Sequence, residues 1–199
     1  MKKLLDRIFI DGLGGMAQGL FATLIIGTII QQIGLFMGGG TGDLIYELGK
    51  IAAGLTGAGI GVGVARKLEA GHLVIVSAAV VGMIGAFAGK ILSGQVLVDG
   101  NLVLAGPGEP LGAFAAAYLA IEIGILISGK TKLDIILTPL VCIGTGSAVG
   151  LFVGPPISEF MLWLGSLINW GTEQQPFLMG IVVSVLMGMI LTLPISSAA

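Results

Sequence analysis

Long apolar stretches, separated by short polar or glycine-rich breaks, dominate the hydropathy pattern of this chain. A helix rises 1.5 Å per residue, so about 20 apolar residues cross the roughly 30 Å hydrocarbon layer of a bilayer. Stretches of this kind recur along the whole chain and predict a membrane protein with about six spans. We place the spans at about Gly12–Met37, Asp43–Val64, His72–Leu92, Pro110–Ser128, Leu133–Val153 and Gln175–Leu193.

Three segments depart from a simple span. Residues 96–104 read VLVDGNLVL, two short β-type runs around an Asp-Gly pair, which predicts a small extracytoplasmic β-hairpin. The fifth span contains Pro139 and a Gly-Thr-Gly-Ser run, so we expect a broken helix over Thr138–Ser147. Residues 158–170 are too short to span and carry two tryptophans, which favours a re-entrant or interfacial helix.

The composition agrees with this picture. The 199 residues are 55% hydrophobic and 10% charged, with 35 glycines and a mean hydropathy of +1.07, whereas soluble domains carry about 25% charged residues. We therefore expect the fold class to be all-α, a polytopic transmembrane helical bundle in which residues 1–199 form a single domain.

Several function classes are excluded. The net charge is −2 and no basic cluster is available to bind nucleic acid. Cys142 is the only cysteine and His72 the only histidine, so we expect neither a disulfide framework nor a metal site, and we predict no cofactor. Cys142 itself is predicted to be a small apolar filler.

The basic residues predict the orientation in the bilayer. Basic side chains precede the first span and follow the second and fourth, whereas the intervening loops have none. By the positive-inside rule this pattern favours a cytoplasmic N-terminus. The residues on this side, seven of the nine Lys and Arg, are Lys2, Lys3, Arg7, Arg66, Lys67, Lys130 and Lys132.

The fourth span carries the strongest candidate functional residue. Glu122 lies well inside both ends of this span, and Tyr118 lies one helical turn away on the same face. The opposite face is a row of small residues that allows another helix to approach closely, so the span is expected to be enclosed by protein. An ionisable residue in this setting indicates a solute or proton site. A buried structural acid bonded to Tyr118 is an equal alternative.

Charged residues also mark the second span. Asp43, Glu47 and Lys50 share one predicted helical face with three glycines, so we expect that face to look inward. Glu47 and Lys50 would line the entrance of a pathway or, in the favoured alternative, simply neutralise each other. The glycines are Gly54, Gly57 and Gly61.

The remaining candidates are hydroxyls and one imidazole. Thr138, Thr145 and Ser147 lie in the expected break, where hydroxyls and freed backbone groups would suit a polyol; a kink that serves packing alone is the alternative. His72 begins the third span, where an interfacial helix-start role is favoured over a ligand role.

Four stretches resemble a known family: GLFATLIIGTIIQQIG (19–34), HLVIVSAAVVGMIGAFAGK (72–90), KLDIILTPLVCIGTGSAVGLFVGPPI (132–157) and GMILTLPISSAA (188–199). They are similar to the IIC component of the bacterial phosphotransferase system, type 2, in the branch with PfoR-type regulatory proteins. Members of this family continue beyond the last stretch, so we expect the chain to be the N-terminal part of a longer permease.

The resemblance implies a multi-pass permease of the bacterial inner membrane that binds and translocates a sugar or sugar-like solute. It also implies soluble IIB and IIA phosphoryl carriers as partners, with the phosphoryl chemistry on domains outside this chain, and a homodimer. A membrane sensor with the same fold and no transport is the alternative. Gly108-Glu109-Pro110 faintly resembles the glutamate–proline motif of glucose-type IIC proteins, but it lacks the preceding Ile-Thr and lies at the outer end of the fourth span, so we give it little weight.

Overall fold

The computed structural model describes residues 5–98, 101–172, 179–181, 184–185 and 188. Almost all of this part is helical, and two very short strands lie between the third and fourth predicted spans. The helices are η1 (Arg7–Gly12), α2 (Leu13–Leu20), η2 (Phe21–Ile25), α3 (Ile26–Met37), α4 (Gly39–Gly54), α5 (Thr56–Lys67), α6 (His72–Leu92), α7 (Pro110–Ile127) and α8 (Asp134–Thr172). The strands are β1 (Leu97–Val98) and β2 (Asn101–Leu102).

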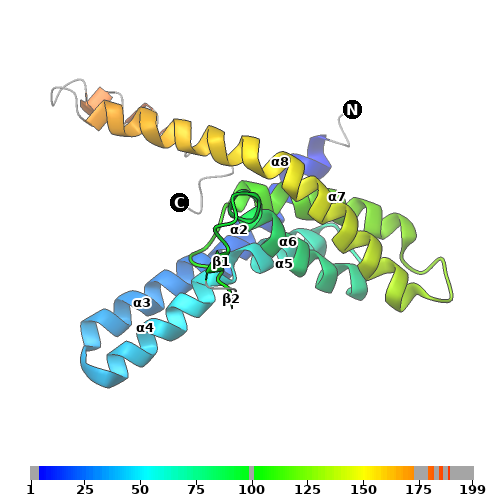
Figure 1. The fold of residues 1–199 in the computed structure, drawn as a ribbon, viewed down its shortest axis with the longest axis horizontal. Coiled ribbons are helices and arrows are strands. Elements are labelled where there is room, and N and C mark those ends of the chain that lie inside the picture. Colours follow the sequence, from blue (N-terminus) through cyan, green and yellow to red (C-terminus); the bar gives the residue numbers. More distant parts are fainter. Residues whose placement is uncertain (1–4, 99–100, 173–178, 182–183, 186–187, 189–199) are drawn as a thin grey trace.

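A central bundle holds the molecule together. Helices α2, α5, α6, α7 and the first half of α8 pack side by side, while the α3–α4 hairpin and the second half of α8 project from this bundle in different directions (Figure 1). The largest fully buried side chains come from the bundle helices: Met16, Leu20, Ile60, Phe87 and Ile121 are among them.

Helices of membrane-spanning length and composition confirm the predicted class of protein. Within the described residues four qualify, and the bent pair α4 and α5 makes a fifth if it is counted as one span. The predicted span at residues 175–193 lies largely outside the described residues, so the count of six stays a prediction. The four helices are Arg7–Met37, His72–Leu92, Pro110–Ile127 and Asp134–Ser166.

The second predicted span is bent rather than straight. Helices α4 and α5 meet at Leu55 with an angle of 50°. At the bend the Leu55 N–H is shared between the carbonyls of Ile51 and Ala52, and the buried Thr56 hydroxyl donates to Ala53 O at 2.6 Å. The helical bond of Leu55 is therefore shared between two carbonyls here, and a local hydroxyl bonds a third.

This bend overturns the single inward face that the sequence pattern predicted. Gly57 and Gly61 on α5 are buried against α6, but Glu47 and Lys50 on α4 are exposed, and so is Asp43. A helical face is continuous only within one helix. The charged residues on α4 are therefore exposed, while the glycines on α5 pack against α6.

The expected break at Thr138–Ser147 is wrong, because α8 is continuous through it. The glycines that suggested a break are packing positions instead. A Cβ on Gly146 would lie 2.8 Å from the Ala120 Cβ and would also collide with Val81, so only glycine lets α8 approach α6 and α7 here. The Thr145 hydroxyl donates back to Val141 O at 2.6 Å and stays within the helix.

The separate re-entrant or interfacial helix at residues 158–170 is also wrong. These residues continue α8, which passes through Pro155 and Pro156 without ending. A Cβ on Gly154 would lie 2.6 Å from the Ala88 Cβ, so the helix is held against α6 just before the prolines. Prolines inside membrane helices are tolerated where neighbouring structure supports the freed backbone groups.

Backbone-to-backbone glycine contacts fix the relative positions of the bundle helices. A Cβ on Gly15 of α2 would lie 2.6 Å from Gly63 O on α5, and one on Gly57 of α5 would lie 2.6 Å from Gly82 O on α6. Gly85 of α6 faces Gly112 of α7 in the same way. Small residues at such crossings drive helix packing in bilayers, where lipid offers no hydrophobic contrast.

The two strands follow α6. Leu97 pairs with Leu102 and Val98 with Asn101 in an antiparallel register. Their connection falls outside the described residues. The chain then runs from β2 back along the end of α6 and enters α7 at Pro110.

Candidate functional site

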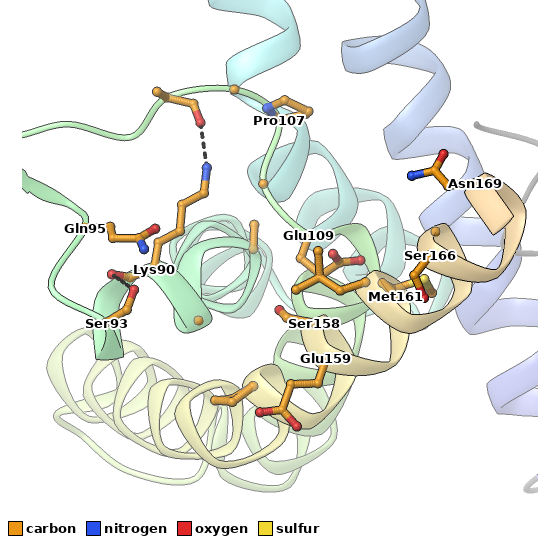
Figure 2. Close-up of a pocket in the computed structure, with 18 residues that line it drawn as sticks. Lys90, Ser93, Gln95, Pro107, Glu109, Ser158, Glu159, Met161, Ser166 and Asn169 are labelled. Atoms are coloured by element: carbon orange, nitrogen blue, oxygen red, sulfur yellow. Dashed lines mark hydrogen bonds between the residues drawn. The ribbon is translucent and has the colours of Figure 1, made fainter. Parts of the chain in front are cut away.

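A cavity of about 910 Å³ lies between the end of α6, the segment that leads into α7, and the second half of α8 (Figure 2). Its size falls within the roughly 300–1,000 Å³ range of small-molecule sites. Many of its lining residues are polar, although it adjoins an apolar bundle. The polar lining residues are Lys90, Ser93, Gln95, Glu109, Ser158, Glu159, Ser166 and Asn169.

The backbone around Glu109 is fixed by its two neighbours in sequence. Gly108 has a φ of +72°, and a Cβ on it would lie 2.7 Å from the Ala86 Cβ, so glycine is needed both for the turn and for the close approach to α6. The Glu109 N–H donates to Ala86 O at 2.7 Å. Pro110 opens α7 and holds Glu109 in an extended conformation. These contacts pin Glu109 over the end of α6.

The Glu109 carboxylate is partly buried and has no ion-pair partner among the residues that the structure describes. It occupies the N-cap position of α7 without capping it. Burial raises the pKa of the Glu109 carboxyl, and the nearby Leu111 N–H opposes this rise only in part. A fixed acid with open acceptor capacity therefore faces the cavity.

The charge of Lys90 is already engaged. Its Nζ donates to Ala105 O at 3.2 Å and lies 5.4 Å from the centroid of the Phe87 ring, a cation–π contact. Figure 2 shows the side chain extended toward the 105–107 segment and away from Glu109. Lys90 thus ties this segment to α6 and does not neutralise Glu109.

A second polar cluster joins the first helix to α7. Arg7 Nε donates to Glu122 Oε1 at 2.6 Å and Arg7 Nη2 to Glu122 Oε2 at 3.3 Å. The Tyr118 hydroxyl is buried and makes no hydrogen bond within the described part of the chain. Gly12 packs beside this cluster, where a Cβ would lie 3.2 Å from the Phe114 ring and 3.3 Å from the Tyr118 ring. The sequence pattern predicts Tyr118 as the partner of a structural Glu122, whereas the partner that the structure shows is Arg7.

The other predicted site residues on α8 are three hydroxyls, and two of them form hydrogen bonds within the helix. The buried Thr138 hydroxyl donates to Asp134 Oδ1 at 2.6 Å, and the Thr145 hydroxyl is bonded within the helix. Ser147 is partly buried. The three hydroxyls are therefore not gathered at a break in the membrane.

The remaining predicted residues lie at the surface. Glu47 and Lys50 form a 3.5 Å ion pair with both side chains about 60% exposed, which supports the self-neutralising alternative. His72 is exposed at the start of α6. Of the eight predicted residues, the structure brings together Tyr118 with Glu122 and Glu47 with Lys50. None of the eight lines the cavity, and their contact with a solute stays a prediction.

Sequence reasoning missed the cavity residues. Lys90 and Glu109 lie near helix ends, where charged residues are common and carry little information. Glu159 lies inside α8. The available signal was the Gly108-Glu109-Pro110 run, whose glycine and proline restrict the backbone on both sides of an acid. Ser158 and Glu159 join it only because α8 continues past residue 157.

Helices of spanning length and composition, packed through glycines, define an integral membrane protein. The chain belongs to the family described as Phosphotransferase system, EIIC, which it matches over residues 10–199. Neither the curated proteins nor the solved structures give a match. The protein is thus a permease component of this transport system, and membership implies a sugar substrate and IIA and IIB partners.

Proposed function

We propose that the cavity beside Glu109 binds the sugar that this permease translocates. The observation that supports the proposal is a partly buried carboxylate, fixed by Gly108 and Pro110 and without a described ion-pair partner, in a cavity of solute size. Sugar hydroxyls are hydrogen-bond donors, and an ionised carboxylate can accept from two of them at once. Gln95 and Ser158 would supply further hydrogen bonds.

The positive-inside pattern supports an extracytoplasmic position for this site. With a cytoplasmic N-terminus in a bacterial inner membrane, α6 ends and α7 begins on the outer side. The cavity would then receive sugar from outside. Glu122 lies thirteen residues further along α7, about 20 Å toward the cytoplasm. Sugar would leave on that inner side, where the IIB partner supplies the phosphoryl group.

We also propose a homodimer, and a place in the PfoR-type branch of the family. The supporting observation for the dimer is the exposed ion pair of Glu47 and Lys50 on α4, within a segment long enough to cross the membrane. Charged side chains in a span are costly against lipid, so this face is expected to be covered by protein. Cross-linking between cysteines placed at Leu44 in two copies, at low protein density in native membranes, tests the dimer.

The binding proposal is tested on the full-length protein reconstituted in lipid nanodiscs, with sugar binding measured by calorimetry. Glu109→Gln keeps the shape of the side chain and removes its charge, and is expected to weaken sugar binding about tenfold, the equivalent of one hydrogen bond to a charged group. Glu69→Gln, on the exposed turn after α5, is the matched control and should bind as the native protein does. Equal affinity in the native protein and both variants would contradict the proposal.

Flux separates a transporter from the sensor alternative. Proteoliposomes that contain the native protein and its phosphoryl carriers are expected to accumulate labelled sugar phosphate. Binding without any flux would favour a sensor that retains the permease fold.

A further inference from the structure

Among the three charged side chains that line the cavity, only Lys90 has a partner for its charge within the described part of the chain. Lys90 is held by Ala105 O and the Phe87 ring, so its ammonium is already partnered. Glu109 and Glu159 have no ion-pair partner among the described residues. Glu109 is partly buried while Glu159 is exposed at the rim, where Figure 2 shows its carboxylate turned away from the other labelled side chains. The cavity therefore has an excess of negative charge, and that excess is concentrated at Glu109.

A partly buried carboxylate without an ion-pair partner is unfavourable, and an approaching cation reduces that penalty. An ammonium group on the solute would form a charge-assisted hydrogen bond with Glu109, which is stronger than a bond from a neutral hydroxyl. A carboxylate or phosphate on the solute would instead be repelled by Glu109 and Glu159. Lys90 would not offset this repulsion, because its ammonium already contacts Ala105 O and the Phe87 ring.

Resting on the proposed function, we infer that this cavity selects sugars that carry a free, protonated amine. Glu109 is the specificity-determining residue, because it is the fixed and partly buried acid. Gln95 and Ser158 serve the hydroxyl groups that all sugars share, since neither side chain has a hydrogen-bond partner within the described residues. Neutral sugars are bound more weakly than amino sugars, and sugar acids are excluded.

Two polar side chains in the lining support recognition of a hydrophilic ring. Gln95 offers both a donor and an acceptor, and Ser158 offers a hydroxyl from α8, while Ala86 and Gly89 leave room beside α6. These groups come from three separate segments of the chain. A sugar that contacts all three would bridge α6 and the second half of α8.

The test is a competition experiment on the full-length native protein in nanodiscs at near-neutral pH, with gluco-, galacto- and manno-configured sugars in matched sets. Each set contains the 2-amino sugar, its neutral N-acetyl derivative, the parent sugar and the corresponding sugar acid. Within the best-bound configuration, the free amine is expected to bind about tenfold more tightly than the parent sugar. The N-acetyl derivative controls for bulk at the same position, and the sugar acid should show no measurable binding.

Two variants locate the effect. Glu109→Gln should abolish the preference for the free amine and leave weaker binding of the parent sugar, whereas Glu159→Gln should retain most of the preference. Sugar binding with no preference for the amine, or a preference that survives Glu109→Gln, would overturn the inference while leaving the proposed function intact. Failure of every sugar to bind would overturn the proposed function itself.

Discussion

Arg7 and Glu122 are 115 residues apart in the sequence and form an ion pair with 2.6 Å between Nε and Oε1. Both side chains are partly exposed, at 40% and 31%. The pair attaches the first helix to α7 beside the buried Tyr118 hydroxyl. An unpaired charge in a membrane-spanning helix is energetically costly. The ion pair lowers that cost for both helices, because each charge offsets the other.

This relationship predicts the behaviour of charge variants. Glu122→Gln leaves Arg7 without its partner and is expected to destabilise the protein by about 1–3 kcal/mol. The exchanged pair, Arg7→Glu with Glu122→Arg, should recover part of that loss. Thermal unfolding in detergent, followed by the loss of helical circular dichroism, measures both. Single variants as stable as the native protein, or an exchange no better than the singles, would contradict a stabilising pair.

The same variant tests the earlier hypothesis that Glu122 contacts the solute. Sugar affinity in Glu122→Gln that equals the native value would remove Glu122 from the binding site. Reduced affinity with unchanged stability would place it there.

Close packing of α8 predicts opposite effects at two neighbouring glycines. Gly146→Ala forces a Cβ to 2.8 Å from the Ala120 Cβ and is expected to cost about 1–3 kcal/mol. Gly144→Ala meets nothing within 4 Å and should be neutral, or stabilising by up to about 1 kcal/mol through helix propensity. Melting temperatures of the two variants check this. Equal destabilisation at both positions would favour a flexible break there after all.

The turn before α7 predicts that alanine variants of Gly106 and Gly108 differ in sugar affinity. Gly106 and Gly108 both have positive φ, so alanine at either costs about 1 kcal/mol or more in backbone strain. Only Gly108→Ala also collides with Ala86. We expect Gly108→Ala to lower sugar affinity by displacing Glu109, and Gly106→Ala to keep the affinity. Loss of binding in Gly106→Ala alone would show that Gly108 does not position the acid.

Burial of Glu109 predicts a pH dependence of stability. Its folded pKa is raised above the ordinary value of 4.5, so the folded state binds more protons than the unfolded state between the two pKa values. The stabilising effect of protonation is complete below 4.5 and is lost as the pH rises through the folded pKa.

Glu109→Gln removes this titration. Relative to the native protein, the variant should gain stability as the pH rises through that window. Melting temperatures of both proteins across the window measure the difference. A constant offset at every pH would mean that the folded and unfolded pKa values of Glu109 are the same.

Much of the fold was open to prediction from the sequence. Helix α6 begins at His72 and ends at Leu92 as predicted, because Gly71 precedes a continuous apolar run and Ser93-Gly94 follow it. The predicted fourth span ended one residue later than α7 does. A proline at the first helical position marked its beginning. Helices α6 and α7 were predictable because glycine, serine or proline residues mark where they begin or end.

The bend at Leu55 and the continuity of α8 could not be predicted in the same way. Glycine is a poor helix former in isolation, so Gly144 and Gly146 looked like a break. In the folded bundle a glycine at 146 is what allows three helices to meet. Local propensity and tertiary packing oppose each other here, and packing prevails.

The candidate site was harder to predict because it is assembled from three distant segments. Depth within a span singled out Glu122, but the sequence could not show that Arg7 occupies its carboxylate. The position of Glu109 at a helix end looked ordinary until α8 was seen to pass beside it. Contacts between segments, rather than residue types, distinguish the two acids.

The most direct measurement is a density map of the full-length protein with a bound sugar, determined in a lipid environment. Sugar density between α6 and α8, within hydrogen-bond distance of the Glu109 carboxylate, is the predicted result. Sugar density beside Glu122 and Tyr118, with the cavity at Glu109 empty, would contradict it.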